Sequence, residues 1–356
     1  MDDVGHSPDL AARIAAWDAV GRYWRAQAAA DPLWRAACGA AVAAQPFFTV
    51  ENIGYATAAW ADALRADRLS AWWASEMGAA TRLRPATVAV VMAGNLPWVG
   101  LHDVLSVLLS GCRLLLKPSA KDRPLWEFWL RNLWPYPESV VLTGDLTGQP
   151  FDAVIATGSD NSYRYFEYGF RGKPALLRRH RTSCAVLTGR EDNLQLAGLW
   201  EDMLRYFGLG CRNVSMLFVP RHFDWDGFLA VGRRKGWARL LDNVAYAHNY
   251  RRRKALLDMQ GLTYKDGGHV LFEAGADAPG PASVGYAVYD DPGEAWRRIE
   301  ASGSEAWQCI VAETPVPSGL ATDLRPVPFG RAQFPTLTDY ADGVSIPAFL
   351  KENFAI

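Results

Sequence analysis

Apolar residues recur at helical spacing in the first part of the chain. Leu10, Ile14 and Trp17, for example, follow one another at intervals of four and three positions. This spacing places the apolar side chains on one face of a helix. We therefore expect residues 1–85 to form a helical segment that packs on the domain that follows it.

The pattern changes at Thr87, where short apolar runs begin to alternate with helical stretches. The runs VAVVMAG and CRLLLKPS flank the helical stretch WVGLHDVLSVLLSG, and SVVLTG and FDAVIATGS continue the alternation. Strands that are separated by helices in this way predict parallel crossovers and a doubly wound sheet. We assign residues 86–207 to a Rossmann-like α/β domain, which would end with the helix NLQLAGLWEDMLRYF at Phe207.

A second α/β pattern follows this helix. The runs SMLFVP, SVGYAVY and CIVAE are expected to be strands, and the stretches around RRRKALLDMQG and PGEAWRRIEAS to be helices. We assign residues 208–325 to a second α/β domain. The tail, residues 326–356, is rich in proline and glycine, and we expect it to return to the first domain or to a partner subunit.

Charge and composition exclude several classes of partner. Lys and Arg number 37 against 38 Asp and Glu, which gives a net charge of -1, so no overall field attracts nucleic acid or an anionic membrane. The most apolar region, residues 86–116, contains Asn95, His102, Asp103 and Arg113, which are costly in a bilayer. We expect no nucleic-acid partner and no membrane span.

The five cysteines are widely scattered, at Cys38, Cys112, Cys184, Cys211 and Cys309. They form neither a CxxC pair nor a Cys/His cluster, so the sequence predicts no disulfide framework and no metal site. Scattered free thiols are typical of a reducing compartment, and the first residues do not resemble a signal peptide. We therefore expect a cytoplasmic protein.

One cysteine lies in an unusual setting, the stretch FGLGCRNVS. Gly208 and Gly210 flank the approach to Cys211 and permit unusual backbone angles close to a substrate. Arg212 would favour the thiolate if it faced the sulfur. The alternative is that Cys211 is a small core residue and that Arg212 is solvated.

Three further stretches place polar residues at the ends of predicted strands. In VMAGNLPW, Asn95 either caps a helix that opens at Pro97 and Trp98 or donates its amide to a developing oxyanion. KPS, with Lys117 and Ser119, and TGS, residues 157–159, are suited to ribose and phosphate groups, although turns often contain such residues. Neither a GxGxxG fingerprint nor a GxxxxGK[ST] loop is present.

The order and spacing of these stretches resemble the aldehyde dehydrogenase superfamily. Within it, AGNLPWVGLHDVLSVLLSGCRLLLKPS, FGLGCRNVSMLFVP and FGRAQFPTLTDYADGV are most similar to acyl-CoA reductases of the bacterial bioluminescence type. The resemblance covers the chain from about Thr87 to its end. It implies an aldehyde dehydrogenase-like fold, with an NADP-binding domain at residues 86–207 and a catalytic domain at residues 208–325.

The resemblance also implies roles for the site residues. Cys211 would be the nucleophile that takes the acyl group as a thioester, and Asn95 would form the oxyanion hole with the backbone NH of Cys211. The cofactor would be held by five residues. These are Lys117 and Ser119 at the adenosine ribose and Thr157, Gly158 and Ser159 at the pyrophosphate.

Two departures from the family pattern define the expected chemistry. NAD-preferring members commonly carry an acid three residues after the lysine, whereas this chain has Ala120 followed by Lys121, which suits the 2′-phosphate of NADPH. Hydrolytic members carry a water-activating glutamate where this chain has HRTSCAVLTG, with no carboxylate before Glu191. Without that base the thioester would exchange with CoA. The family also departs from this chain at the Glu-x-Phe-Gly-Pro turn that positions the nicotinamide, whose best counterpart here is DAPGP, residues 277–281. A nicotinamide contact from Asp277 is therefore left unassigned.

We therefore expect NADPH-dependent reduction of an acyl-CoA, or of an acyl carrier protein thioester, to the aldehyde, with an acyl chain that is expected to be fatty. The rivals are a cysteine-dependent acyltransferase without hydride transfer and a non-catalytic scaffold that binds nucleotide or CoA. His180 is a weak candidate for a proton shuttle, and Arg178 and its basic neighbours are candidates for phosphate contacts.

The role of the tryptophans and the assembly of the chain each have two interpretations. The tryptophans of the helical stretches either pack in the core, which their spacing favours, or line a tunnel for a long chain; they include Trp72, Trp73, Trp126, Trp129 and Trp134. The chain would form a homo-oligomer or dock with an acyl-activating partner enzyme.

Overall fold

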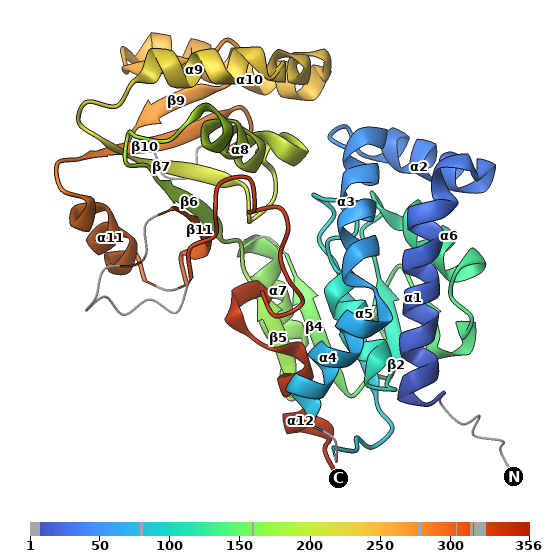
Figure 1. Ribbon diagram of the computed structural model, residues 1–356. Coiled ribbons are helices and arrows are strands. Elements are labelled where there is room, and N and C mark those ends of the chain that lie inside the picture. The colour runs from blue at the N-terminus through green and yellow to red at the C-terminus, as the bar shows by residue number, and fades with distance from the viewer. Residues whose placement is uncertain are drawn as a thin grey trace, which may run out of the picture. The chain divides into compact units, whose positions relative to one another are not determined.

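The chain folds into two compact units (Figure 1). In this computed structural model the described residues are 8–78, 81–158, 160–275, 280–303, 305–313, 316 and 325–356. Unit 1 comprises Met1–His180 and Thr336–Ile356, and unit 2 comprises Arg181–Pro335.

The boundary between the units differs from the one predicted at residues 207 and 208. It falls after His180, because strand β6 (Thr182–Val186) pairs with β7 (Val214–Pro220) and β11 (Trp307–Val311) in the sheet of unit 2. Of the predicted tail, residues 326–335 belong to unit 2 and Thr336–Ile356 belong to unit 1.

Unit 1 begins with the predicted helical segment. Its elements are α1 (Leu10–Ala26), η1 (Ala28–Ala30), α2 (Pro32–Ala44), α3 (Val50–Ala63) and α4 (Ala66–Met77). Side chains cap the start of α1 and of α3. Asp9 accepts a hydrogen bond from the amide of Ala12, and Thr49 accepts one from the amide of Asn52. No helix within the described ranges of either unit combines the length and the apolarity that crossing a membrane requires.

The sheet of unit 1 has five parallel strands in the order β3-β2-β1-β4-β5. The strands are β1 (Thr87–Val91), β2 (Arg113–Lys117), β3 (Val140–Leu142), β4 (Ala153–Thr157) and β5 (Ala175–Arg178). The remaining helices are α5 (Leu101–Leu109), α6 (Arg123–Asn132), η2 (Pro137–Ser139), α7 (Asp160–Gly169), η5 (Ala341–Gly343) and α12 (Ile346–Phe354).

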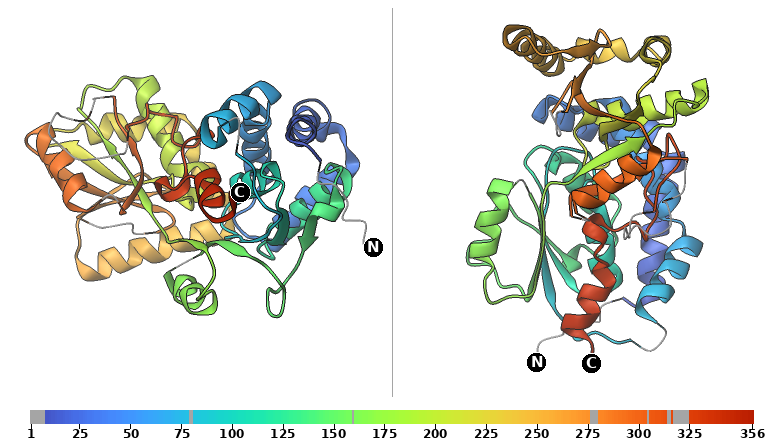
Figure 2. Two further views of the ribbon diagram at one scale, coloured as in Figure 1. Left: turned by 90° about the horizontal axis from the view of Figure 1, so that it is seen from below. Right: turned by 90° about the vertical axis from the view of Figure 1, so that its left-hand side faces the viewer.

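This strand order creates a switch point between β1 and β4. The connection from β1 to β2 runs to one side of β1, and β4 leads to β5 on the other side. Right-handed crossovers in opposite directions place their helices on opposite faces, and Figure 2 shows α7 on one face of the sheet and α1 and α4 on the other. Ligands of open α/β sheets bind at the carboxyl ends of the strands beside such a switch point.

The tryptophans of unit 1 form a packed aromatic core. Trp17 stacks on Trp129 with ring centroids 5.5 Å apart, and Trp126 meets Trp98 edge-on at 5.0 Å. Trp126 and Trp129 are fully buried, and Trp134 is 5% exposed. These contacts favour the packing interpretation of the tryptophans over a tunnel.

The sheet of unit 2 has six strands in the order β11-β6-β7-β10-β9-β8, and only the β8–β9 pair is antiparallel. The strands not yet given are β8 (Tyr264–Asp266), β9 (Leu271–Ala274) and β10 (Ser283–Tyr289). The helices are α8 (Asn193–Leu204), η3 (Arg205–Gly208), α9 (Trp225–Arg234), η4 (Trp237–Asp242), α10 (Val244–Gln260) and α11 (Pro292–Ala301).

Helices cover both faces of this sheet. Trp296 of α11 belongs to a buried cluster with Val186 and Phe218 of the sheet. On the other face Trp200 of α8 stacks on Phe228 of α9 at 4.9 Å, and both rings meet Phe272. Figure 1 shows α8, α9 and α10 on that face and α11 on the opposite one.

The last segment of unit 2 packs closely on α8. Val327 forms a bridge with Val311 at the edge of the sheet, and the chain then crosses the helix at Gly198. A Cβ atom on Gly198 would lie 2.8 Å from the backbone nitrogen of Gly330 and 2.9 Å from the carbonyl carbon of Phe329. Only glycine permits this approach between two backbones.

We predict that Gly198→Ala destabilises the protein, although alanine favours a helix more than glycine does. The clash with backbone atoms is expected to lower the free energy of unfolding by about 1–3 kcal/mol. Gly54→Ala in α3 is the matched control, because a Cβ there meets nothing within 4 Å. It is expected to raise stability by up to about 1 kcal/mol. Urea denaturation followed by circular dichroism measures both, and equal stabilisation by both variants would contradict the packing described.

Candidate functional site

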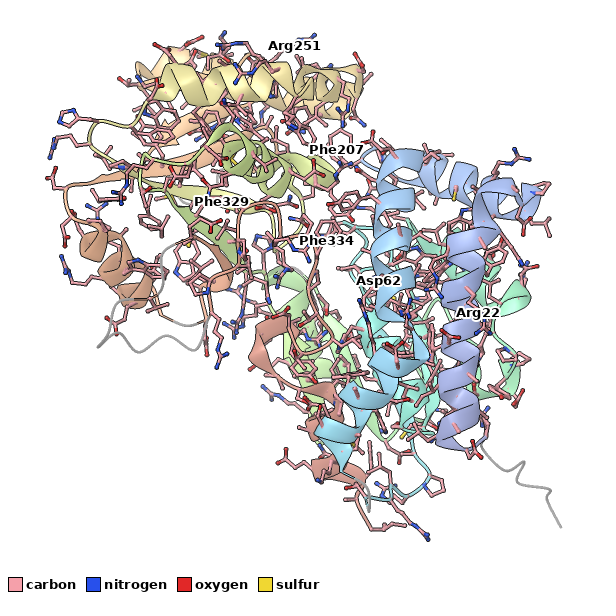
Figure 3. The ribbon with its side chains drawn as sticks, viewed as in Figure 1. Arg22, Asp62, Phe207, Arg251, Phe329 and Phe334 are labelled. Carbon is pink, nitrogen blue, oxygen red and sulfur yellow. The ribbon has the colours of Figure 1, made fainter. Side chains whose placement is uncertain are left out.

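The loop that carries Cys211 begins with a left-handed turn. Helix α8 ends at Leu204, and the next residues include Tyr206 and Phe207 with φ of 55° and 61°, followed by Gly208 with φ of 72°. Non-glycine residues rarely adopt such angles, at a cost of about 1–3 kcal/mol each. The prediction that the helix continues to Phe207, which Figure 3 labels, is therefore wrong.

The side-chain amide of Asn213 holds this turn in place. Its Nδ2 donates to the carbonyl oxygens of Asp202 at 3.0 Å, Met203 at 3.3 Å and Arg205 at 2.8 Å. Its Oδ1 accepts from the amide of Gly210 at 2.8 Å. These carbonyls lie at the end of α8, where the helix itself supplies no donors. Because Asn213 is buried, its hydrogen bonds to both flanks fix the loop on which Cys211 lies.

A second contact fixes Cys211 itself. The hydroxyl of Ser183, which is fully buried on β6, donates to the carbonyl oxygen of Cys211 at 2.8 Å. Ser183 pairs with Val214 at the start of β7. Cys211 therefore lies at the amino-terminal edge of the unit 2 sheet, on a loop that is tied to a neighbouring strand.

Among the five cysteines, Cys211 alone is partly exposed, and the other four are buried. Burial raises the pKa of Cys38 to about 12 and also raises the pKa values of Cys112 and Cys184. These three thiols therefore stay protonated at neutral pH. Cys211 is the thiol that a dissolved substrate can reach.

Arg212 does not have the role that the sequence suggested for it. Its Nε donates to the carbonyl oxygen of Ala332 at 2.5 Å, and its Nη2 lies 3.5 Å from the sulfur of Cys309. The guanidinium thus joins the loop to the segment after β11. Arg212 is therefore not a solvated surface group. Its bonds go to Ala332 and Cys309 and not to the sulfur of Cys211.

Asp202 is a second anchor between α8 and the same segment. Its carboxylate is fully buried and accepts hydrogen bonds from the amides of Gly330 at 2.6 Å and Ala332 at 3.0 Å. Burial raises its pKa to about 7, although these two hydrogen bonds act in the opposite direction. Sequence reasoning missed Asp202, whose signal was a carboxylate in the otherwise apolar face of the helix.

In unit 1, the predicted cofactor residues follow the carboxyl ends of adjacent strands. Lys117 ends β2, Thr157 ends β4, and Asn95 lies in the turn after β1. All three are half-buried. The strand order places Asn95 and Thr157 on the two sides of the switch point.

The turn with Asn95 does not start a helix. Helix α5 begins at Leu101 with Gly100 as its N-cap, so the helix-cap interpretation of Asn95 is wrong. Trp98 has φ of 59°, which interrupts a helix that would open at Pro97. The indole of Trp98 is buried and donates to the hydroxyl of Thr57 at 3.0 Å, which holds this turn on α3.

The GN and KPS turns pack against each other. A Cβ atom on Gly94 would lie 2.1 Å from the hydroxyl oxygen of Ser119 and 3.4 Å from the Cβ of Lys121. The carbonyl oxygen of Gly94 accepts from the buried side chain of Gln45 at 2.8 Å. The structure therefore brings Asn95, Ser119 and Lys121 to one part of the sheet edge.

The TGS turn is described only in part. The amide of Gly158 points to the carbonyl oxygen of Arg178 at 3.4 Å, which extends the pairing of β4 with β5. Ser159 and Asp277 lie outside the described residues. Cys211 belongs to unit 2, whereas the other predicted site residues belong to unit 1.

A buried ion pair lies beside this edge, and sequence reasoning did not identify it. Nη1 of Arg178 donates to both carboxylate oxygens of Asp103, at 2.8 and 2.9 Å, and both side chains are buried. Arg178 was a candidate for phosphate contacts, and the structure instead pairs it with α5. The signal in the sequence was Asp103, a charge inside an apolar helix.

Several solved structures with the same architecture are aldehyde dehydrogenases. No family model and no curated protein matches the sequence. An NAD-dependent aldehyde dehydrogenase from Sinorhizobium meliloti is 16% identical, with a TM-score of 0.61 over 87% of this chain and 72% of that one. The chain has the aldehyde dehydrogenase fold. This confirms the fold predicted from the sequence.

Two other similar structures differ in how much of them this chain covers. An oxidoreductase from Marinobacter aquaeolei is 12% identical, with a TM-score of 0.61 over 93% of this chain and 85% of that one. Proline utilization A is 17% identical, with a TM-score of 0.62 over 86% of this chain, which spans 36% of its length. At these identities the likeness concerns the fold.

We predict that the native protein has one fast-reacting thiol. Because four cysteines are buried and Cys211 is partly exposed, Ellman's reagent should titrate about one thiol per chain before unfolding and all five after it. Cys211→Ala should remove the fast phase, and Cys38→Ala should leave it unchanged. A fast phase that survives in Cys211→Ala would contradict the burial pattern.

Proposed function

We propose that this protein reduces an acyl-CoA thioester to the aldehyde with NADPH, through an acyl group carried on Cys211. The observation that carries the proposal is the setting of Cys211, the partly exposed thiol on a loop that Asn213 and Ser183 hold rigidly. A fixed, accessible thiol in an aldehyde dehydrogenase fold is suited to covalent catalysis.

In the proposed reaction the chain supplies a nucleophile and donors for an oxyanion. The Cys211 thiolate attacks the thioester carbonyl and CoA leaves as its thiolate. The side-chain amide of Asn95 and the backbone NH of Cys211 stabilise the negative charge on the carbonyl oxygen, each by about 3 kcal/mol in comparable sites. NADPH, when bound, supplies the hydride that converts the acyl group to the aldehyde.

The carboxyl edge of the unit 1 sheet fits a dinucleotide. The switch point lies between Asn95 and Thr157, and the missing side chain of Gly94 leaves room for the tight turn against Ser119. Lys117 and Ser119 would meet the adenosine ribose, and Thr157, Gly158 and Ser159 the pyrophosphate. The amide of Gly158 would have to relax its long bond to Arg178.

The segment that carries a water-activating glutamate in hydrolytic enzymes supports a reductase rather than a hydrolase. In this chain it forms β6, and its first carboxylate, Glu191, follows the carboxyl end of that strand. Glu191 accepts hydrogen bonds from the amides of Thr188 at 2.6 Å and Gly189 at 3.0 Å. Cys211 lies at the amino-terminal edge of the same sheet. Glu191 therefore stabilises a turn at the opposite edge, away from Cys211.

The finer features of the substrate rest on the family resemblance. We propose a fatty acyl chain that is delivered by CoA or by an acyl carrier protein, and a chain that works as a homo-oligomer or docked with an acyl-activating enzyme. A cysteine-dependent acyltransferase remains the rival, because the same accessible thiol would serve it.

The test follows NADPH absorbance and CoA exchange in parallel, with acyl-CoAs of different chain length. The proposal expects acyl-dependent oxidation of NADPH that Cys211→Ala abolishes, while Cys38→Ala, the buried control, retains it. Exchange of labelled CoA without NADPH oxidation would establish the acyltransferase instead. Activity that persists in Cys211→Ala would exclude both.

We also predict that Lys121 determines the preference for NADPH. Its side chain is exposed and makes no ion pair within the described part of the chain, and its Cβ faces Gly94. Lys121→Ala should lower kcat/KM for NADPH about tenfold and leave that for NADH unchanged, since one charged contact to the 2′-phosphate is lost. The control is Lys235→Ala, an exposed lysine of unit 2. Equal losses with both cofactors would contradict the assignment.

A further inference from the structure

A cavity of about 840 Å³ opens at the amino-terminal edge of the unit 1 sheet, the edge opposite to the proposed cofactor site. Its walls include the starts of β1 and β2, the end of α5 and the end of α4. The first turn of α1 and the last residue of the chain, Ile356, complete it. This volume is within the range of small-molecule sites, about 300–1,000 Å³.

Positive charge is concentrated in this cavity. Four arginines line it, namely Arg13, Arg82, Arg84 and Arg113, against two carboxylates, those of Asp152 and of the last residue, Ile356. The whole chain has a net charge of -1, so the excess is local. Asp152 forms no ion pair with an arginine of the described ranges, and its Oδ2 accepts a hydrogen bond from the amide of Thr87 at 2.7 Å.

Two of these arginines have guanidinium groups without a partner in the described part of the chain. Among the described residues, the guanidinium groups of Arg82 and Arg113 have neither an ion-pair nor a hydrogen-bond partner, and both side chains are exposed. Arg84 lies over the ring of Phe354 at 4.8 Å, and Arg13 donates to the carbonyl oxygen of Pro8 at 2.5 Å. Arg82 and Arg113 are therefore the groups that can bind an anion.

The floor of the cavity is apolar. Leu10, Leu83 and Pro85 line it with partly or fully exposed side chains, and the buried side chains of Trp73 and Met77 lie beneath them. The neighbouring hydroxyl of Ser110 donates to the carbonyl oxygen of Val107 at 2.6 Å. An arginine rim above an apolar floor matches a molecule with an anionic head and an apolar body.

We propose that this cavity binds an amphiphilic carboxylate, with its head between Arg82 and Arg113 and its alkyl chain on Leu10, Leu83 and Pro85. The burial of the alkyl chain contributes affinity in proportion to its area, and the arginines select the charge. The inference rests on unit 1 alone and does not depend on the role of Cys211.

The test uses dodecanoate and a dodecanoate analogue with a diazirine near the end of its chain. Titration calorimetry of the full chain is expected to show one saturable site that weakens with added salt. Photolysis of the analogue followed by peptide mapping should place the label within residues 10–13, 73–87 or 109–113. The same labelling is expected in Cys211→Ala, which separates this site from the proposed reaction.

Matched variants identify the charge contacts. Arg82→Gln/Arg113→Gln should weaken dodecanoate binding about tenfold or more and remove the label. Arg35→Gln/Arg164→Gln removes two exposed, unpaired arginines of unit 1 that lie outside the cavity, and it should change affinity less than twofold. Loss of affinity in both double variants, equal binding of dodecyltrimethylammonium, label confined to other peptides, or no saturable binding would each overturn the proposal.

Discussion

The site in unit 2 depends on the hydrogen bonds of one buried amide. Asn213 donates to three carbonyls at the end of α8 and accepts from the amide of Gly210. A carboxylate could not donate these bonds, and a hydroxyl could not span both flanks. The amide thus compensates the left-handed conformations of Tyr206 and Phe207, and it fixes the backbone on which Cys211 lies.

Asp202 and Arg212 connect that loop to the last segment of unit 2, at residues 330–332. Asp202 accepts from the amides of Gly330 and Ala332, and Arg212, which directly precedes Asn213, donates to the carbonyl oxygen of Ala332. The segment FGRAQ therefore has a structural function next to the cysteine loop. A thiol held at both flanks loses little freedom when it reacts, which is what covalent catalysis requires.

Sequence reasoning identified the architecture because hydrophobic periodicity is a local property. The alternation of VAVVMAG, WVGLHDVLSVLLSG and CRLLLKPS corresponds to β1, α5 and β2. The boundary at His180 could not be read in this way, because the strand that follows it joins the sheet of unit 2 through partners that are distant in sequence. The end of α8 was misplaced for a related reason, since Phe207 continues the apolar spacing and its φ depends on Asn213.

The same limit applied to the site. Cys211 and Asn95 were selected from their own neighbours in the sequence, as glycine-flanked or strand-end residues usually can be. Asp202, Ser183 and the Asp103–Arg178 pair act through contacts with residues far along the chain. Asp202 and Asp103 could be noticed only as charges in apolar stretches, and Ser183 left no signal in the sequence.

The central claim is that Cys211 carries the acyl group. Intact-protein mass spectrometry after incubation with a panel of acyl-CoAs, in the absence of NADPH, tests it most directly. We expect one acyl adduct per chain that maps to Cys211, is released by hydroxylamine and is absent in Cys211→Ala. No adduct with any chain length, or an adduct that persists in Cys211→Ala, would contradict it.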